Sequence, residues 1–273
     1  MNMDRPHPSG AAPRDSFGAA RDPSGAAPRD WDASTYDRIA NPMTQWGEAV
    51  VDRLTLTGSE RVLDAGCGSG RVTERLLARL PTGTVVALDA SPRMVDEARR
   101  RLAAFGDQVE YLVADLGSPL AIRPVDAILS TATFHWVADH EALFANLAAV
   151  LKPGGQLVAQ CGGAGNLATV MAVLDEVDPD RRAWRPWHFA TPEDTRQRLE
   201  AAGFRDIDVW LHDEPTVLSP ETVPEYLRTI IFGATLERMA EADREPFVQA
   251  MAARIPGGLL DYVRLNIVAR RAG

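Results

Sequence analysis

Short apolar stretches recur between residues 60 and 160, and three of the first four end near an aspartate. Apolar stretches of this length are typical of strands that are buried on both faces of a sheet. Segments with helical spacing separate them, so the pattern predicts alternating strands and helices, and hence a parallel sheet. The predicted strands are residues 60–65, 84–89, 109–116, 125–131 and 151–158, followed by 204–211 and 260–270.

The first predicted strand runs into a glycine-rich turn, Asp64-Ala65-Gly66-Cys67-Gly68-Ser69-Gly70, and a helix is predicted from Arg71 onward. Glycine permits a positive φ and lets a ligand lie against the backbone. The unpaired N–H groups at the start of a helix favour a negatively charged group. The turn therefore predicts a site for a small polar ligand. Its G-x-G-x-G spacing differs from the G-x-G-x-x-G of dinucleotide-binding turns.

Acidic residues follow the next two predicted strands. The second strand ends at Asp89, 19 residues beyond Gly70, which is close to the interval expected of a ribose-binding acid. Ser91 then suits an N-cap and Pro92 the first helical position. The third strand leads to Asp115. Because open α/β sheets bind ligands at the carboxyl ends of their strands, we expect these acids and the glycine turn to line one site.

This ordered set of motifs, which closes with Leu151-Lys152-Pro153-Gly154-Gly155, resembles the class I S-adenosylmethionine (SAM) dependent methyltransferases over residues 31–271, most specifically over 60–160. The resemblance implies an α/β fold with a Rossmann-like, doubly wound, seven-stranded sheet whose last strand is antiparallel. It also implies helices before the first strand and a helical cover inserted before the last strand. The protein is thus expected to be an enzyme that uses SAM as its cofactor, and no metal is expected.

The resemblance places the cofactor against the glycine turn and the ends of the following strands, at Asp64, Gly66, Gly68, Gly70, Asp89, Ala90, Asp115, Leu116 and Ser130. The turn is expected to shape the site of the methionine end, with Gly70 opening the next helix. Asp89 is expected to bind the ribose. Asp115 and Leu116 are expected to face the adenine, and the carbonyl of Ser130 to receive the methionine amino group.

The segment after the fourth strand, Phe134-His135-Trp136 followed by Asp139-His140, bears on the methyl acceptor. It is similar to the same region of trans-aconitate methyltransferases and insect hormone-acid methyltransferases, which make methyl esters of small carboxylic acids. The Asn-Pro-Pro-Tyr signature of amine-directed relatives is absent. His135 is the candidate catalytic residue, which would orient a carboxylate or act as a base toward a hydroxyl; a structural histidine is the alternative. Trp136 is expected at the site wall.

Two further segments are expected to cover the site. The apolar spacing in residues 31–57 predicts one or two helices, and Trp46 is expected to pack on the sheet. The resemblance implies that these helices form a lid in which Tyr36 covers the cofactor. Residues 219–256 predict two helices over the substrate. Arginine binds carboxylates in a bidentate fashion, and the sequence does not choose among Arg228, Arg238, Arg254 and Arg264. A cluster of aromatic residues offers instead an apolar pocket for a more lipophilic acid, at Trp184, Trp187 and Phe189.

Composition limits the remaining possibilities. Residues 1–30 contain a duplicated low-complexity segment and predict a disordered tail ahead of one domain, 31–273, with its SAM-binding core at 60–160. The net charge of −9 and the scattered basic residues argue against nucleic acid as a partner. No apolar run is long enough to span a membrane. Two isolated cysteines and no signal peptide favour the cytoplasm, and the sequence leaves the oligomeric state unknown.

The favoured function is methyl transfer to a small molecule, most simply to a carboxylate oxygen, since a carboxylate is ionised at neutral pH and needs no base. The alternatives are an O- or C-methyltransferase of secondary metabolism and a methyltransferase for a carrier-bound malonyl group. A non-catalytic SAM-binding regulatory protein is an alternative of another class. An NAD-dependent oxidoreductase would require a third glycine at the dinucleotide spacing, which is missing.

Overall fold

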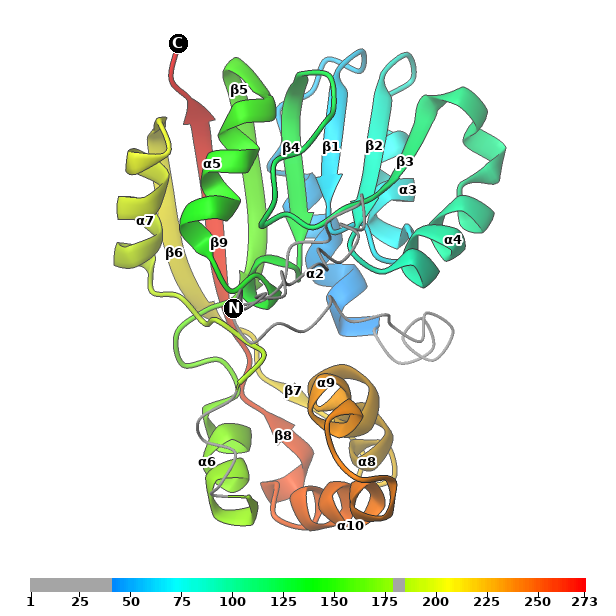
Figure 1. Cartoon of the computed structure of the whole chain (residues 1–273), viewed down its shortest axis with the longest axis vertical. Coiled ribbons are helices and arrows are strands. Elements are labelled where there is room, and N and C mark those ends of the chain that lie inside the picture. Colours follow the sequence, from blue (N-terminus) through cyan, green and yellow to red (C-terminus); the bar gives the residue numbers. More distant parts are fainter. Residues whose placement is uncertain (1–40, 179–184) are drawn as a thin grey trace, which may run out of the picture.

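The computed structural model describes residues 41–178 and 185–273. The predicted tail, Tyr36 and Trp184 lie outside these residues. The core is a seven-stranded sheet of order β3-β2-β1-β4-β5-β9-β6 (Figure 1). Its strands are β1 (Arg61–Ala65), β2 (Thr84–Asp89), β3 (Val109–Val113), β4 (Val125–Thr131), β5 (Leu151–Gly162), β6 (Phe204–Asp213) and β9 (Val263–Arg271).

The direction of the strands confirms the predicted topology. β1 to β5 pair in parallel, whereas β9 is antiparallel to both of its neighbours, β5 and β6. All strands except β9 therefore present their carboxyl ends at one edge of the sheet. The amino end of β9 reaches the same edge, because Arg264 pairs with Gly162 of β5 and with His212 of β6.

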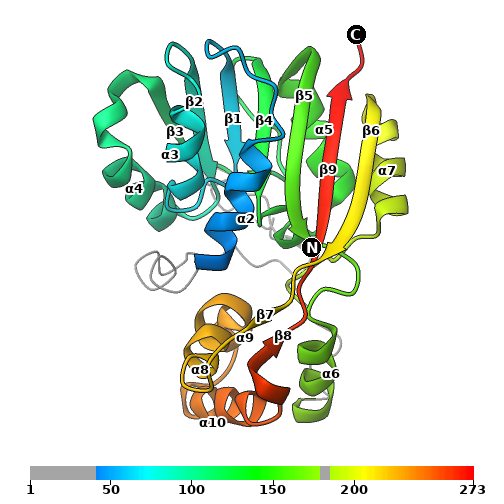
Figure 2. The same cartoon turned by 180° about the vertical axis from the view of Figure 1, so that it is seen from behind.

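Helices cover both faces of the sheet. One face carries α2 (Asn41–Val51), α3 (Arg71–Leu77) and α4 (Pro92–Arg101), as Figure 2 shows. The other carries α5 (His140–Val150) and α7 (Pro192–Ala201). The helix starts follow the sequence: the side chains of Ser91 and Thr191 accept hydrogen bonds from the N–H groups of Met94 and Asp194. A proline opens each of these two helices.

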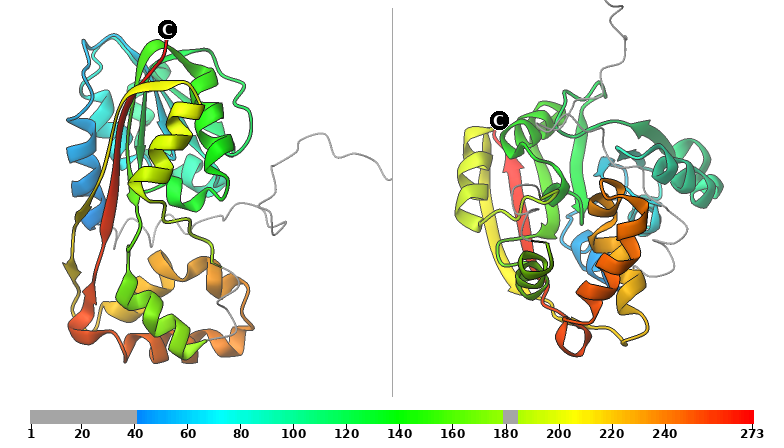
Figure 3. Two further views of the ribbon diagram at one scale, coloured as in Figure 1. Left: turned by 90° about the vertical axis from the view of Figure 1, so that its left-hand side faces the viewer. Right: turned by 60° about the horizontal axis from the view of Figure 1, so that its bottom comes forward.

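A second, helical lobe lies beyond the carboxyl ends of the parallel strands (Figure 3). It contains α6 (Ala168–Val177), α8 (Val223–Tyr226), η4 (Leu227–Ile231), α9 (Gly233–Glu237), α10 (Glu241–Ala252) and the short pair β7 (Thr216–Val217) and β8 (Leu259–Leu260). The lobe has its own apolar core. We call this helical lobe the cover. The described residues also contain three short 3₁₀ turns: η1 (Ala103–Gln108), η2 (Phe134–Trp136) and η5 (Pro256–Gly258).

The structure corrects three expectations. The third strand ends at Val113, and Asp115 lies in the turn that follows, where its carboxylate accepts the N–H of Gly117. Residues 220–254 form four helical segments instead of two, because the helix changes from α to π geometry at Leu227 and the backbone leaves helical geometry at Phe232 and again at Ala240. Trp46 packs against the cover and the ring of Tyr262, whereas the sequence suggested the sheet.

Candidate active site

The glycine turn is fastened to the end of β2. The N–H groups of Gly66 and Cys67 both donate to the carbonyl of Leu88, at 2.8 Å each. Gly66 has a φ of 93°, and a Cβ there would lie 2.0 Å from Oγ1 of Thr133. Gly68 has a φ of 53°, and a Cβ there would meet no atom within 4 Å. Gly66 thus packs against the end of β4, while Gly68 faces open space where a ligand can approach the backbone.

Asp89 lies directly beside this turn. Its Oδ2 accepts the N–H of Gly68 and its Oδ1 accepts the N–H of Ser91, both at 2.9 Å. Burial raises the pKa of the carboxyl, and these N–H groups together with that of Ala90 lower it. Each carboxylate oxygen has a further lone pair, so the half-buried Asp89 can also accept from ligand hydroxyls.

Asp64, at the end of β1, is a buried acid under the turn. Its Oδ2 accepts from the hydroxyl of Thr73 at 2.7 Å, whereas its Oδ1 has no hydrogen-bond partner in the part of the chain that the structure describes. Burial, together with the charge of Asp89, raises its pKa to about 7. Two acids this close repel each other, and a positively charged ligand nearby would relieve that repulsion.

The other predicted cofactor residues occupy the same edge in different ways. Asp115 is half-buried in the turn after β3. The side chain of Leu116 is 4% exposed and belongs to the core, and its carbonyl accepts from the side chain of Asn146. Ser130 donates its hydroxyl to the carbonyl of Ala65 at 2.6 Å, which fastens the end of β4 to the end of β1. Ala132, two residues on, has a φ of 54°, a strained conformation for alanine.

His135 is held as a neutral hydrogen-bond donor. The N–H of Gly162 donates to its Nδ1 at 3.3 Å, so the ring proton is carried by Nε2. Burial, then the charge of Arg264 and that of His140, hold the pKa of His135 well below its ordinary value. Nε2 has no hydrogen-bond partner among the described residues. The residue His135 as a whole is buried, with 9% of its surface exposed. The arrangement can donate one proton to an acceptor atom and is poorly suited to remove one.

A row of aromatic rings runs from His135 toward the cover. The centroid of Trp136 is 5.3 Å from that of His135 and 6.1 Å from that of Trp187. Trp187 in turn stacks on Phe189 and meets Phe232 of the cover edge-on. The half-buried Trp136 therefore lies in a continuous aromatic wall between sheet edge and cover.

His140 has a structural role. Its Nε2 donates to the carbonyl of Phe134 at 2.9 Å and its ring stacks on that of His188 at 4.2 Å. Burial lowers the pKa of His140 to about 4, although the hydrogen bond to the Phe134 carbonyl acts in the opposite direction. These contacts hold η2 in place and so fix where His135 lies.

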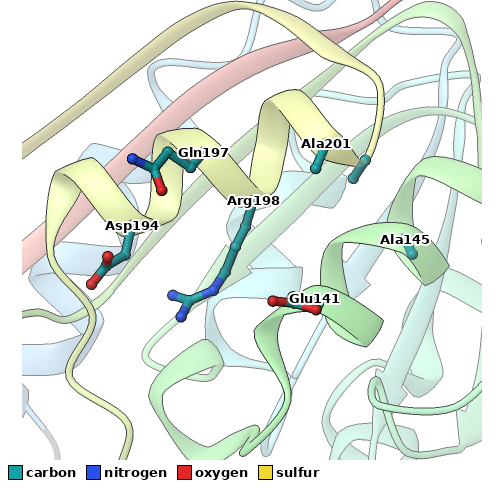
Figure 4. A pocket seen from close by; sticks show the side chains of 7 residues that line it. Glu141, Ala145, Asp194, Gln197, Arg198 and Ala201 are labelled. Carbon is teal, nitrogen blue, oxygen red and sulfur yellow. The ribbon is translucent and has the colours of Figure 1, made fainter.

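A separate groove lies between α5 and α7 (Figure 4). Its lining includes Glu141 and Ala145 of α5 and Asp194, Gln197 and Arg198 of α7. None of the residues predicted for the cofactor or the acceptor lines it. The groove is therefore distinct from the site at the strand ends.

The fold and the strand-end acids define a Rossmann-like nucleotide-binding protein whose glycine turn lacks the dinucleotide spacing. Residues 62–155 match the family model described as a methyltransferase domain. An uncharacterized methyltransferase of Schizosaccharomyces pombe is 30% identical over 244 residues, which cover 81% of this chain and 90% of that protein. A trans-aconitate 2-methyltransferase of Acidovorax ebreus is 28% identical over 241 residues, with the same coverage of both chains.

Among solved structures, the Haemonchus contortus phosphoethanolamine N-methyltransferase 2 bound to S-adenosylhomocysteine shares the fold. Its TM-score is 0.60 at 18% identity, over 88% of this chain and 57% of that one. The protein belongs to the class I SAM-dependent methyltransferases, and SAM is its cofactor. The residues at the strand ends fit SAM. Gly68 leaves room for it beside the turn, and the acids Asp64 and Asp89 complement its positive charge.

Proposed function

We propose that the protein transfers the methyl group of SAM to a carboxylate oxygen of a small organic acid. The observation that carries this proposal is the hydrogen bond from the N–H of Gly162 to Nδ1 of His135. Because Nδ1 accepts from Gly162, the neutral ring offers an N–H and no lone pair to the acceptor. Such a ring can orient an acceptor that is already ionised, whereas a phenol or alcohol requires removal of a proton. The names of the trans-aconitate 2-methyltransferase relatives support the same class of acceptor.

SAM, when bound, supplies a methyl carbon attached to a positively charged sulfur. We propose that the carbonyl of Ser130 and the glycine turn hold its methionine end, that Asp89 and Ala90 hold the ribose, and that Asp115 and Leu116 flank the adenine. His135 holds one oxygen of the acceptor carboxylate through Nε2–H, so that the other oxygen is aligned with the methyl carbon. One C–O bond forms, the C–S bond breaks with its electron pair left on sulfur, and no proton moves.

The site is expected to be closed by aromatic residues. Trp136, Trp187 and Phe189 line the side toward the cover, and we propose that they exclude water from the reacting carboxylate. Tyr36, outside the described residues, is proposed as a lid over the cofactor.

The test is incubation of the full chain with methyl-labelled SAM and a panel of small carboxylic acids, phenols, amines and malonyl carriers. We expect label in products of the acids only, released by mild base as methanol, because methyl esters are base-labile. A labelled product that survives mild base would refute the ester. Binding of SAM without turnover of any acceptor would indicate the regulatory alternative.

A further inference from the structure

Two histidines from different segments hold the backbone of η2, the turn that carries His135. Nε2 of His140, in the first turn of α5, donates to the carbonyl of Phe134 at 2.9 Å. The backbone N–H of His188, in the segment before α7, donates to the carbonyl of His135 at 2.8 Å. The two peptide groups that flank the Cα of His135 are therefore each bound by one of these residues. We call His140 and His188 the histidine pair.

The imidazole rings of the histidine pair lie against each other. Their centroids are 4.2 Å apart and their planes differ by 10°. Nδ1 of His188 also lies 3.2 Å from the carbonyl oxygen of Ala138, and because that oxygen can only accept, Nδ1 carries the proton. The stacked rings thus join the start of α5 to the segment before α7, and η2 is bonded to both.

The surroundings keep His140 uncharged. Burial is the main cause of its lowered pKa, and the charges of His188 and Arg198 add to it, whereas that of Asp139 opposes them. Arg198 extends from α7 toward α5, as Figure 4 shows. A neutral His140 has one ring N–H, and the carbonyl of Phe134 accepts it. Uncharged rings can stack without the repulsion that two imidazolium charges would cause.

The ring of His135 is held separately, from the sheet. The N–H of Gly162 in β5 donates to its Nδ1, while the histidine pair holds the backbone on both sides of its Cα. Ring and backbone together fix the direction in which Nε2–H points. A reacting atom has to be aligned closely with its partner, and a displacement of about 1 Å can lower a rate by about 100-fold. The backbone of η2 therefore bears on the reaction as well as on stability.

We propose that His140 and His188 are positioning residues for methyl transfer, which as a stacked pair hold η2 so that Nε2–H of His135 meets the acceptor in line with the methyl group. The proposal rests on the proposed function in one respect, that His135 contacts the acceptor. Both residues act through η2. Their loss should misalign an acceptor that still binds, and so should lower kcat more than it raises KM.

The first test is made at His140. His140→Phe keeps a ring that can stack on His188 and removes the N–H that holds the carbonyl of Phe134. The assay uses the small acid that the wild-type protein esterifies best in the panel described above. We expect kcat to fall by about 2- to 12-fold, the range for loss of one hydrogen bond, and KM to change by less than about twofold. His140→Gln can place an amide N–H near the position of Nε2, so it should recover most of the loss.

The second test is made at His188. His188→Ala removes the stacked ring and leaves the backbone N–H in place, and we expect a loss in kcat of similar size, because a pair of stacked rings contributes a comparable free energy. His188→Phe restores a ring and should recover most of it. Thr195→Val on α7 is the matched control, since it removes a buried hydroxyl that donates to the carbonyl of Thr191 at 2.7 Å. It should leave kcat unchanged.

Binding of S-adenosylhomocysteine, measured by calorimetry, gives the concentration of folded protein, so that kcat is expressed per folded molecule. A purely structural role would lower the melting temperature and leave this kcat unchanged in the His140→Phe and His188→Ala variants, and that result would overturn the proposal. Equal losses in His140→Phe and His140→Gln would also overturn it. If His140→Phe does not fold, His188→Ala decides.

The proposed function can fail separately from this inference. A wild-type protein that methylates only phenols or amines would refute the carboxylate acceptor, and the same variants would then be compared with that acceptor. A wild-type protein that esterifies acids, together with variants that lose no activity, would leave the proposed function in place and overturn the positioning role of the histidine pair.

Discussion

The proposed cofactor half and the proposed acceptor half of the site are built in different ways. The cofactor half consists of the glycine turn and the end of β2, and backbone N–H groups from residues 66–68 and 90–91 shape it. The acceptor half consists of side chains from α2, η2, the segment before α7, and β9. The comparison teaches that a site made of backbone is encoded in short local stretches, whereas a site made of side chains depends on packing between distant segments.

The sharpest test of the cofactor half is Gly68→Ala. The added methyl group would enter the open space against the turn, so we expect the affinity for SAM to fall by about 100-fold or more through loss of close backbone approach. Gly257→Ala is the matched control, because Gly257 has a similar φ of 58° and also has nothing within 4 Å of a Cβ. Both variants should lose about 1–2 kcal/mol of unfolding free energy. Calorimetry with SAM should distinguish them; equal affinities would place the cofactor elsewhere.

The acceptor half is tested at His135 with two substitutions. His135→Phe removes the Nε2–H donor, and we expect kcat/KM for the acid to fall by about 10- to 100-fold, the range for loss of a hydrogen bond to a charged group. His135→Gln can place an amide N–H near the position of Nε2, so it should recover most of this loss. A general base would be lost in both variants, and equally low rates for the two would therefore contradict the donor role.

Asp64→Asn tests the electrostatics under the glycine turn. The pKa of Asp64 is raised to about 7 in the folded protein, so the folded state binds its proton more tightly than the unfolded state does. The wild-type protein should therefore lose stability as the pH rises from about 4 through 7. Asn carries no charge, so the stability of the variant relative to wild type should rise by about 2–3 kcal/mol between pH 5 and pH 8.

Denaturant unfolding at the two pH values measures this difference. We also expect Asp64→Asn to bind SAM more weakly at pH 8, because it removes a negative charge near a cationic ligand. A variant whose stability relative to wild type does not rise between the two pH values would mean that the buried carboxylate is already compensated.

The smallest effect is expected at Ala132, at the end of β4. Its φ of 54° strains an alanine but not a glycine. Ala132→Gly should therefore raise the free energy of unfolding by less than about 1 kcal/mol, since relief of strain is partly offset by the greater freedom of the unfolded chain. Thermal unfolding measures the shift. A loss of stability would show that the methyl group of Ala132 contributes more through packing than its backbone costs.

Local signals predicted most of the strands and helix starts around the proposed cofactor half. The strands β1, β2 and β4 and the N-cap at Ser91 lie where the sequence placed them, and the last strand is antiparallel as the resemblance implied. The sequence placed Asp115 in the third strand, but the residue lies in the turn after β3, where its carboxylate accepts the N–H of Gly117. In the cover, the break at Phe232 has no proline to signal it, and the sequence therefore suggested continuous helices.

The acceptor half gave weaker signals. Polar residues at Arg264 and Asn266 alternate with the buried Leu265 and Ile267, and both polar side chains are buried too. A buried polar residue in a strand is a sign of function. The alternation of polar and apolar residues along β9 instead suggested that the polar residues face solvent. Thr73, which binds Asp64, and Trp46, which packs on Arg264, carried no such signal, because only the folded chain brings each beside its partner.

The sequence by itself determined the order of strands and helices, the glycine turn and the acids that follow the strands. These depend on interactions between residues that are near one another in the chain, or on the shared edge that every parallel sheet possesses. Only the tertiary structure decided that His135 carries its proton on Nε2 and that Arg264, alone of four candidate arginines, is buried beside it. Both facts depend on Gly162, because a ring tautomer and a buried charge are set by whichever groups the fold brings into contact.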